Sequence, residues 1–163
     1  MRSKKLNLAF RVKRPVIALG SHTKNTVCFA EDSVAYLSPV ALDLGELPFF
    51  LEFEKHVKFF MRRTPRLVAY DLHPEYESTK YALELRGTGF EFIPVQHHHA
   101  HILSCMAEHG LKNRKVIGVA LDGTGLGADS RMWGAEFMVC DYRGFVREGH
   151  LMEIPLLGME QAV

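Results

Sequence analysis

Apolar positions recur at two spacings along the first part of the chain, and they predict strands followed by a helix. Residues 16–20, 26–30 and 33–40 are short apolar runs bounded by polar turns, which is typical of strands. After these runs, phenylalanine and valine recur every three or four residues between Pro48 and Pro65. Proline is favoured in the first turn of a helix and ends a helix elsewhere, so this segment is predicted to be helical.

Two further pairs of a strand and a helix are predicted after Pro65. Residues 67–72 and 90–95 are apolar runs of strand length, and each leads into a segment with helical spacing. The first segment begins near Pro74, and the second begins at His97 and ends at Gly110. The predicted order is therefore three strands, helix, strand, helix, strand, helix.

The pattern of the first strands begins again near residue 115, which suggests a duplicated unit. Residues 115–121 are predicted as a buried strand, residues 122–127 as a glycine-rich turn, and residues 132–141 and 145–154 as two further strands. Helices follow the strands in the first copy, whereas only residues 155–163 remain here. An uncovered sheet leaves apolar surface in water, so we expect one complete α/β unit and one truncated unit.

Charge is uneven only near the N-terminus. Residues 1–14 carry six basic side chains and no acidic one, which would suit a basic arm for tRNA or lipid. The run is short and ends at Pro15, so a solvated leader or linker is the favoured interpretation. We therefore expect three parts: a basic leader over residues 1–14, a first unit over residues 15–111, and the start of a second unit over residues 112–163.

Composition indicates a soluble globular protein, with 47% hydrophobic and 24% charged residues among 163. The formal net charge of +1 gives no electrostatic reason to expect a nucleic-acid or membrane partner. The apolar residues 6–10 are too few for a signal sequence or a membrane span, so the cytoplasm is the expected location. The three cysteines are an odd number without a CxxC pair, which argues against disulfides and a zinc ribbon.

Four histidines lie within five residues, in the sequence His97-His98-His99-Ala100-His101. At about 3.6 residues per turn, His97 and His101 fall on one helix face, opposite the apolar residues. Two imidazoles at this spacing can reach one metal ion, so these two are candidate ligands for zinc or iron. His99 is expected to point with the apolar residues and His98 to lie on the flank. Two ligands make an incomplete site, and a polar helix terminus or a histidine packed in a core are the alternatives.

Two turns carry residues that suit an anion such as a phosphate. In Asp122-Gly123-Thr124-Gly125 the glycines allow close approach, Thr124 offers a hydroxyl, and Asp122 could hold a metal or a water. In the first turn, Lys24 lies beside hydroxyl residues and could pair with a phosphate. Ordinary hairpin turns are the alternative for both segments, but two such turns in a duplicated frame could enclose a nucleotide.

Asp71 and His73 lie at the carboxyl end of the predicted strand 67–72, where open α/β sheets usually place ligands. Asp71 could act as a general base or a metal ligand. His73 directly precedes Pro74, so a role as the cap of the following helix is the simpler interpretation for its side chain.

Four segments, taken in order, resemble a known family: VIALGSHTKNTVCFA, VAYDLHPEYESTKYA, VQHHHAHILSCMAEHGL and VIGVALDGTGLGADSRMWGAEFMV. Together they cover about residues 14–160 and are similar to the C-terminal domain of the HypF carbamoyltransferases of nickel–iron hydrogenase maturation. That domain is itself similar to the universal tRNA threonylcarbamoyladenosine synthase. The resemblance implies an α/β fold of the actin-like ATPase (ASKHA) class, in which an RNase H-like unit is duplicated.

The resemblance also implies an activity. Members of the family make carbamoyl adenylate from carbamoyl phosphate and ATP and pass the carbamoyl group to the C-terminal cysteine of the acceptor protein HypE. His97 and His101 match the family's metal-binding HxxxH, and a divalent metal there would act as a Lewis acid. Lys24 and the segment Asp122-Gly123-Thr124-Gly125 match its nucleotide-facing turns. The resemblance singles out no catalytic residue.

The end of the chain departs from the family pattern. Residues 155–160 stand where the family usually has a Pro-Gly-Gly-Asp turn, and most of the second lobe would lie beyond residue 163. We therefore expect a piece of a HypF chain that is inactive without the remainder and lacks a metal ligand. Whether it is a broken gene product or one piece of a split enzyme stays open at this point.

Three other functions also stay open. A relative of the tRNA threonylcarbamoyl transferases is favoured by the basic leader and disfavoured by the three adjacent histidines. A non-catalytic interaction fragment of the same fold fits the expected truncation. A sugar or acetate kinase of the same superfold needs an acidic base that nothing in the sequence singles out.

Overall fold

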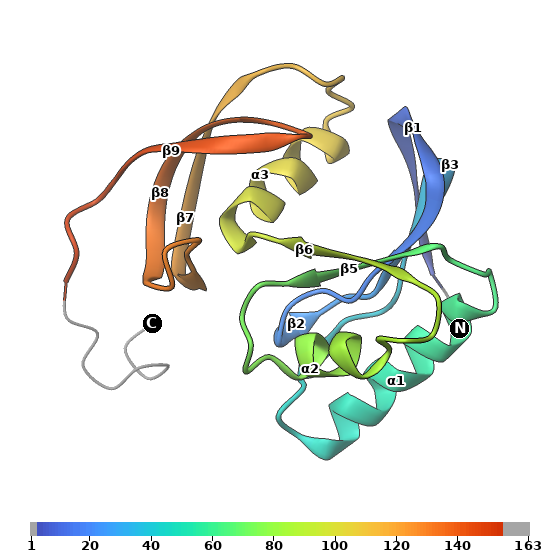
Figure 1. The fold of residues 1–163 in the computed structure, drawn as a ribbon. Helices are drawn as coiled ribbons and strands as arrows, with labels where there is room; N and C mark the ends of the chain where they lie inside the picture. The colour runs from blue at the N-terminus through green and yellow to red at the C-terminus, as the bar shows by residue number, and fades with distance from the viewer. Residues whose placement is uncertain (1–2, 155–163) are drawn as a thin grey trace. The chain divides into compact units, whose positions relative to one another are not determined.

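The computed structural model describes residues 3–154, and the chain divides into two compact units. The first unit takes in the residues up to Val95 together with Ala107–Lys112, and the second takes in Gln96–Met106 and the residues from Asn113 onward. Both units combine strands with helical residues (Figure 1), so the predicted α/β class is confirmed at this level.

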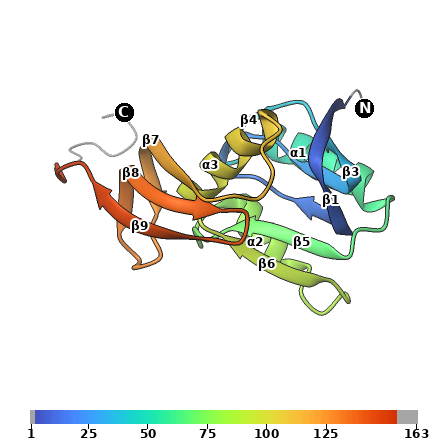
Figure 2. The same cartoon turned by 90° about the horizontal axis from the view of Figure 1, so that it is seen from above.

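Strands and helices alternate in the later part of the first unit. Its strands are β1 Lys4–Ala18, β2 Thr23–Asn25, β3 Cys28–Leu37, β4 Ala41–Asp43, β5 Leu67–Asp71 and β6 Glu91–Val95. Four of them form one mixed sheet in the order β3-β1-β5-β6 (Figure 2), in which β1 and β3 are antiparallel and β1, β5 and β6 run parallel. β2 and β4 form a separate antiparallel pair.

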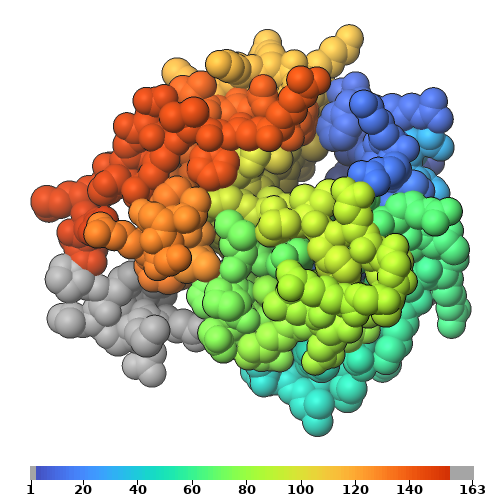
Figure 3. Space-filling view, viewed as in Figure 1, coloured from blue at the N-terminus to red at the C-terminus, as the bar shows by residue number. Residues whose placement is uncertain are grey.

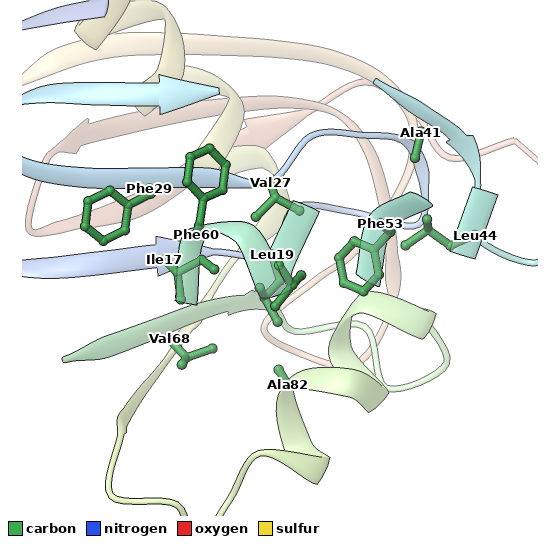
Figure 4. Close-up of a cluster of buried hydrophobic side chains, with 11 residues drawn as sticks. Ile17, Leu19, Val27, Phe29, Ala41, Leu44, Phe53, Phe60, Val68 and Ala82 are labelled. Atoms are coloured by element: carbon green, nitrogen blue, oxygen red, sulfur yellow. The ribbon is translucent and has the colours of Figure 1, made fainter. Parts of the chain in front are cut away.

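Two helices complete this unit, α1 Leu47–Met61 and α2 Glu77–Glu84. Pro48 lies in the first turn of α1, as predicted, and the helix buries Phe53, Val57 and Phe60 at helical spacing. These side chains join strand residues such as Ile17 in one apolar cluster (Figure 4). In the space-filling view, the yellow-green atoms around α2 and β6 lie at the front of the unit (Figure 3).

The second unit is a three-stranded meander with a helix packed on it. Its elements are α3 His97–Glu108, β7 Val116–Leu126, β8 Met132–Asp141 and β9 Gly144–His150, and the strands are antiparallel in the order β7-β8-β9. Ile102 of α3 lies directly over Gly118 of β7, where any side chain would collide with it. Glycine at this position therefore lets the helix approach the sheet closely.

One face of this meander is apolar and exposed. Ile117, Val119 and Leu121 alternate along β7, and Ile117 and Leu121 are 81% and 77% exposed. Alternate residues of a strand share a face, so the three side chains form one row. Residues 155–163, on which the expected truncation and the departure from Pro-Gly-Gly-Asp depend, lie outside the described residues.

The N-terminal segment corrects one sequence-based prediction. Residues 4–14 are not a solvated leader but the first part of β1, in which Lys5 pairs with Tyr36 and Leu6 with Ala35 of β3. Hydrogen bonds to β3 satisfy the backbone N–H and C=O groups of this segment. Its basic side chains occupy exposed positions of the strand, so a basic run does not exclude a strand.

The predicted strands 26–30 and 33–40 also differ from the structure. Most of both runs belongs to the single strand β3. Asp32 has a φ of 49° at the point where the β1–β3 register shifts. Glu31 and Asp32, which separate the two predicted strands, therefore lie at an irregularity of the kind that a β-bulge produces.

The glycine-rich segment is the third difference. Residues 122–126 continue β7 rather than forming a turn, and the register against β8 shifts between Leu121 and Gly125. The chain reverses later, where the N–H of Gly127 donates to the carbonyl of Arg131 at 2.8 Å. The glycines therefore mark an irregular strand beside α3.

Smaller differences concern the helices. α2 begins at Glu77 rather than at Pro74. The predicted boundary at residues 111/112 would place the histidine helix in the first unit, whereas Gln96–Met106 packs with the strands of the second unit. None of the described helices is both long enough and apolar enough to span a membrane.

Candidate metal centre

The two histidines singled out by their spacing are adjacent in space. His97 is the first residue of α3 and His101 lies one turn later, so their side chains share one helix face. Their Nε2 atoms are 3.2 Å apart, and their rings are close to perpendicular, at 83°. His97 is largely covered and His101 is exposed, so one side of this pair is open to solvent.

Asp122 of β7 supplies a carboxylate to the same point. Its Oδ2 lies 3.1 Å from Nε2 of His97 and 3.7 Å from Nε2 of His101. Its other oxygen, Oδ1, accepts the N–H of Gly123 at 2.8 Å. One donor atom from each of His97, His101 and Asp122 lies within 4.8 Å of the others. The structure thus adds a carboxylate to the pair predicted from the sequence.

The carboxylate of Asp122 is held in its charged form. Burial alone would raise its pKa, but the imidazoles of His101 and His97 and the N–H of Gly123 hold that pKa well below its usual range. Oδ2 is nevertheless buried, and it has no hydrogen-bond partner among the residues that the structure describes. A buried anionic oxygen in this state is costly, which is the condition expected of an atom that receives a cation.

A third imidazole faces the same oxygen. His98 is fully buried, and its Nε2 lies 3.8 Å from Oδ2 of Asp122. The helical wheel places this residue on a flank, but Trp133 of β8 covers that flank, with the two ring centroids 6.0 Å apart. Burial is the main cause that lowers the pKa of His98. His99 points into the apolar side as predicted, where its ring lies 5.1 Å from Phe145.

Gly125 has a packing role in this site. A Cβ at this position would lie 2.7 Å from Cε1 of His98 and 2.8 Å from Cδ2 of His97. Both rings therefore rest directly on the backbone of β7. The glycine that the sequence suggested for close approach of a phosphate is also what allows the close approach of two imidazoles.

A buried ion pair that the sequence analysis missed lies on the same sheet. Glu136 of β8 is 1% exposed and receives two hydrogen bonds from Arg147 of β9, at 2.6 Å and 3.0 Å. The guanidinium of Arg147 also lies 4.2 Å from the ring centroid of Trp133. Alternation along β8 places Glu136 on the same face as the buried Met138 and Cys140, and an acidic residue on an apolar face was the available signal.

The other predicted residues belong to the first unit. Lys24 is exposed, with a φ of 47°. Asp71 accepts the N–H of His73 at 2.9 Å, and its carbonyl accepts the hydroxyl of Thr79 at 3.0 Å. The ring of His73 stacks on Tyr76 with centroids 4.2 Å apart. Asp71 and His73 thus organise the turn before α2. The cap position of that helix is Tyr76, without a side-chain cap bond, so the predicted capping role of His73 is wrong.

Comparisons with known proteins identify relatives of both units. Residues 11–108 match the family model of the HypF Kae1-like domain, and residues 118–163 match the second subdomain of the Kae1-like domain of carbamoyltransferases. The chain is 43% identical to the carbamoyltransferase HypF2 of Cupriavidus necator, over 90% of this chain and 19% of that protein. It is 40% identical to the carbamoyltransferase HypF of Synechocystis, over 93% of this chain and 20% of that protein.

Two solved structures have the same fold. Full-length HypF in its phosphate- and nucleotide-bound form gives a TM-score of 0.84 at 43% identity, with 97% of this chain and 21% of that chain covered. HypF of T. kodakarensis gives a TM-score of 0.83 at 32% identity, with the same coverage. The chain therefore spans about a fifth of the length of these relatives.

Proposed function

Because this chain belongs to the HypF carbamoyltransferase family, we propose that it forms part of a carbamoyl-transfer domain of the actin-like ATPase (ASKHA) fold. In this proposal the carbamoyl group of carbamoyl adenylate passes to the C-terminal cysteine of a HypE-like acceptor. Support comes from the two consecutive Kae1-like matches and from the likeness to a HypF solved with phosphate and nucleotide. The remainder of a HypF chain is the proposed partner, without which we expect no turnover, and the cytoplasm is the proposed location.

The observation that carries the proposal is the convergence of His97, His101 and Asp122 on one point. Two imidazole nitrogens and a carboxylate oxygen are donors that Zn²⁺ and Fe²⁺ both accept. The buried oxygen Oδ2 of Asp122 has no hydrogen-bond partner within residues 3–154, which fits a cation at this place. A divalent ion bound there would supply Lewis acidity to an oxygen of the carbamoyl group. Three protein donors leave room for a further ligand.

Nucleotide contacts are proposed for two segments that the sequence analysis singled out. Lys24 offers an exposed ammonium group, and Thr124 of β7 offers a hydroxyl. The N–H of Gly123 already donates to Asp122 at 2.8 Å, so its proposed role is to hold the carboxylate beside the phosphates. Gly125 keeps the backbone close to the histidines. Asp122, which the sequence analysis counted among the nucleotide-facing residues, is therefore proposed as a metal ligand.

Metal binding tests the site directly. Zn²⁺ is titrated calorimetrically into the untagged chain and into the variants His97→Ala, His101→Ala and Asp122→Asn. We expect each to weaken binding at least about tenfold, because each removes one of three donors. His150→Ala is the matched control, since His150 is exposed on β9 outside the cluster. Equal losses for His150→Ala and His97→Ala would overturn the proposed site.

Carbamoyl transfer tests the function. The chain is mixed with the remaining segments of a HypF, carbamoyl phosphate labelled with ¹⁴C, ATP and a HypE-like acceptor, and label on the acceptor cysteine is counted. We expect transfer that needs both the chain and the remaining segments and that is lost with His101→Ala. Transfer that continues without this chain would show that it has no part in the reaction.

A further inference from the structure

The side-chain amide of Gln96, just before α3, has one allowed orientation. Its Oε1 accepts the N–H of His99 at 2.8 Å, and its Nε2 donates to the carbonyl of Leu126 at 3.2 Å. A flipped amide would place its NH₂ against an N–H and its oxygen against a carbonyl, which loses both bonds. Gln96 is also buried, so water cannot replace them. The nitrogen, rather than the oxygen, therefore faces His98.

This orientation fixes the position of the proton on His98. Nε2 of Gln96 lies 3.0 Å from Nδ1 of His98. An amide nitrogen only donates, so Nδ1 must accept with its lone pair and cannot carry a proton. The ring is therefore neutral, with its single proton on Nε2. Oδ2 of Asp122 lies 3.8 Å from this protonated nitrogen.

Nε2 of His98 and Oδ2 of Asp122 are complementary. Within the described part of the second unit they are the buried side-chain nitrogen and oxygen atoms without a hydrogen-bond partner. One is a donor and the other an acceptor, and a shift of less than about 1 Å would bring them to hydrogen-bond distance. Gly125 leaves the ring of His98 room against β7.

We propose that His98 is a positioning residue that donates its Nε2 proton to Asp122, and that Gln96 excludes it from the metal ligands by fixing that tautomer. A protonated Nε2 has no lone pair for a metal, so the adjacent histidines divide between two roles. His97 and His101 offer nitrogens to the ion, and His98 orients the carboxylate. The effect on metal binding rests on the proposed function, whereas the tautomer does not.

The tautomer is measured first, in the metal-free chain. Long-range ¹H–¹⁵N correlation spectra distinguish a protonated Nε2 from a protonated Nδ1, and the His98→Gln variant assigns the signals. We expect the Nε2–H form in the wild type and a proton on Nδ1 in Gln96→Glu, whose carboxylate accepts from Nδ1. A wild-type ring with its proton on Nδ1 would overturn the proposal, whether or not the chain binds metal.

The role of the donor is measured by Zn²⁺ titration. His98→Leu removes it, and we expect affinity to fall about tenfold or more. His98→Gln places an amide N–H near the position of Nε2, so its affinity is expected within about threefold of wild type. If His98 were itself a ligand, His98→Gln and His98→Leu would both match the loss in His97→Ala. Circular dichroism confirms folding, and if His98→Leu does not fold, His98→Gln alone decides between the two roles.

Discussion

The interiors of the two units differ in chemistry. The first unit has a cluster of eleven buried apolar side chains from strands, helices and the turns between them (Figure 4), and the polar side chains that it also buries include Asn25, Ser78 and Thr79. The second unit buries Gln96, His98, His99 and Glu136 together with its apolar residues. Apolar burial favours folding without a specific partner, whereas each buried polar group needs its own hydrogen bond. In the second unit, buried Gln96 and His98 lie next to the candidate metal ligands, so stability and the candidate site depend there on neighbouring residues.

The largest effect is expected in the apolar interior. Phe53 of α1 is 0% exposed and lies edge-on to Tyr81, with centroids 5.4 Å apart. Phe53→Ala removes this ring and leaves a cavity, so we expect a loss of about 3–5 kcal/mol in the free energy of unfolding. Urea denaturation followed by circular dichroism measures it. Leu51→Ala is the control, since Leu51 is on the same helix but exposed; equal losses would contradict the role given to this core.

The sequence predicts the first unit well where local rules decide. Pro48 and the phenylalanine spacing place α1 within about one turn of its observed ends, because capping and amphipathic periodicity are local properties. Asp32 divides one strand into two in the sequence-based prediction. An acidic residue with a left-handed backbone is found in turns and in strand irregularities alike, so the residue type does not distinguish them. Residues 122–126 mislead for the same reason, since glycines serve turns and irregular strands alike.

The candidate site is predictable only in part. The four-residue spacing of His97 and His101 depends on helix geometry alone and brings their nitrogens to 3.2 Å. Asp122 is distant in sequence, and its place beside them depends on how α3 packs on β7. The role of His98 depends on which way the amide of Gln96 faces, and that is fixed by the carbonyl of Leu126. No pattern in the sequence carries such information.

The ion pair of the second unit should have the next largest effect. Arg147→Met leaves the buried carboxylate of Glu136 without its two hydrogen bonds. We expect a loss of about 3 kcal/mol in the free energy of unfolding, because the remaining charge is uncompensated. The double variant Glu136→Met with Arg147→Met should recover most of this loss. Denaturant titrations of all three proteins test it, and a double variant as unstable as the single one would argue against a buried charge as the cause.

Gly125 lies against the rings of His97 and His98, and replacing it tests the geometry of the candidate metal site. Gly125→Ala places a methyl group 2.7 Å from the ring of His98 and 2.8 Å from that of His97. Displacing these rings should weaken Zn²⁺ binding about tenfold. Gly144→Ala is the matched control in the same unit, since a methyl group there meets nothing within 4 Å. Calorimetric titration of both variants compares them, and equal affinities would show that the rings need no such clearance.

The smallest effect concerns the one buried histidine of α1, and it tests how a buried polar side chain of the first unit affects stability. His56 is 5% exposed, and burial lowers its pKa despite Glu52 nearby, 3.9 Å away. Below the ordinary histidine pKa of about 6.5, the unfolded state therefore binds more protons than the folded state. Stability contributed by this residue is present above that pH and falls as the solution is acidified. His56→Gln removes the titration, so its free energy of unfolding should decline less between pH 7 and pH 5 than that of the wild type. Urea titrations at several pH values measure the slopes, and a His56→Gln slope equal to the wild-type slope would show that the buried His56 is not a source of the acid sensitivity.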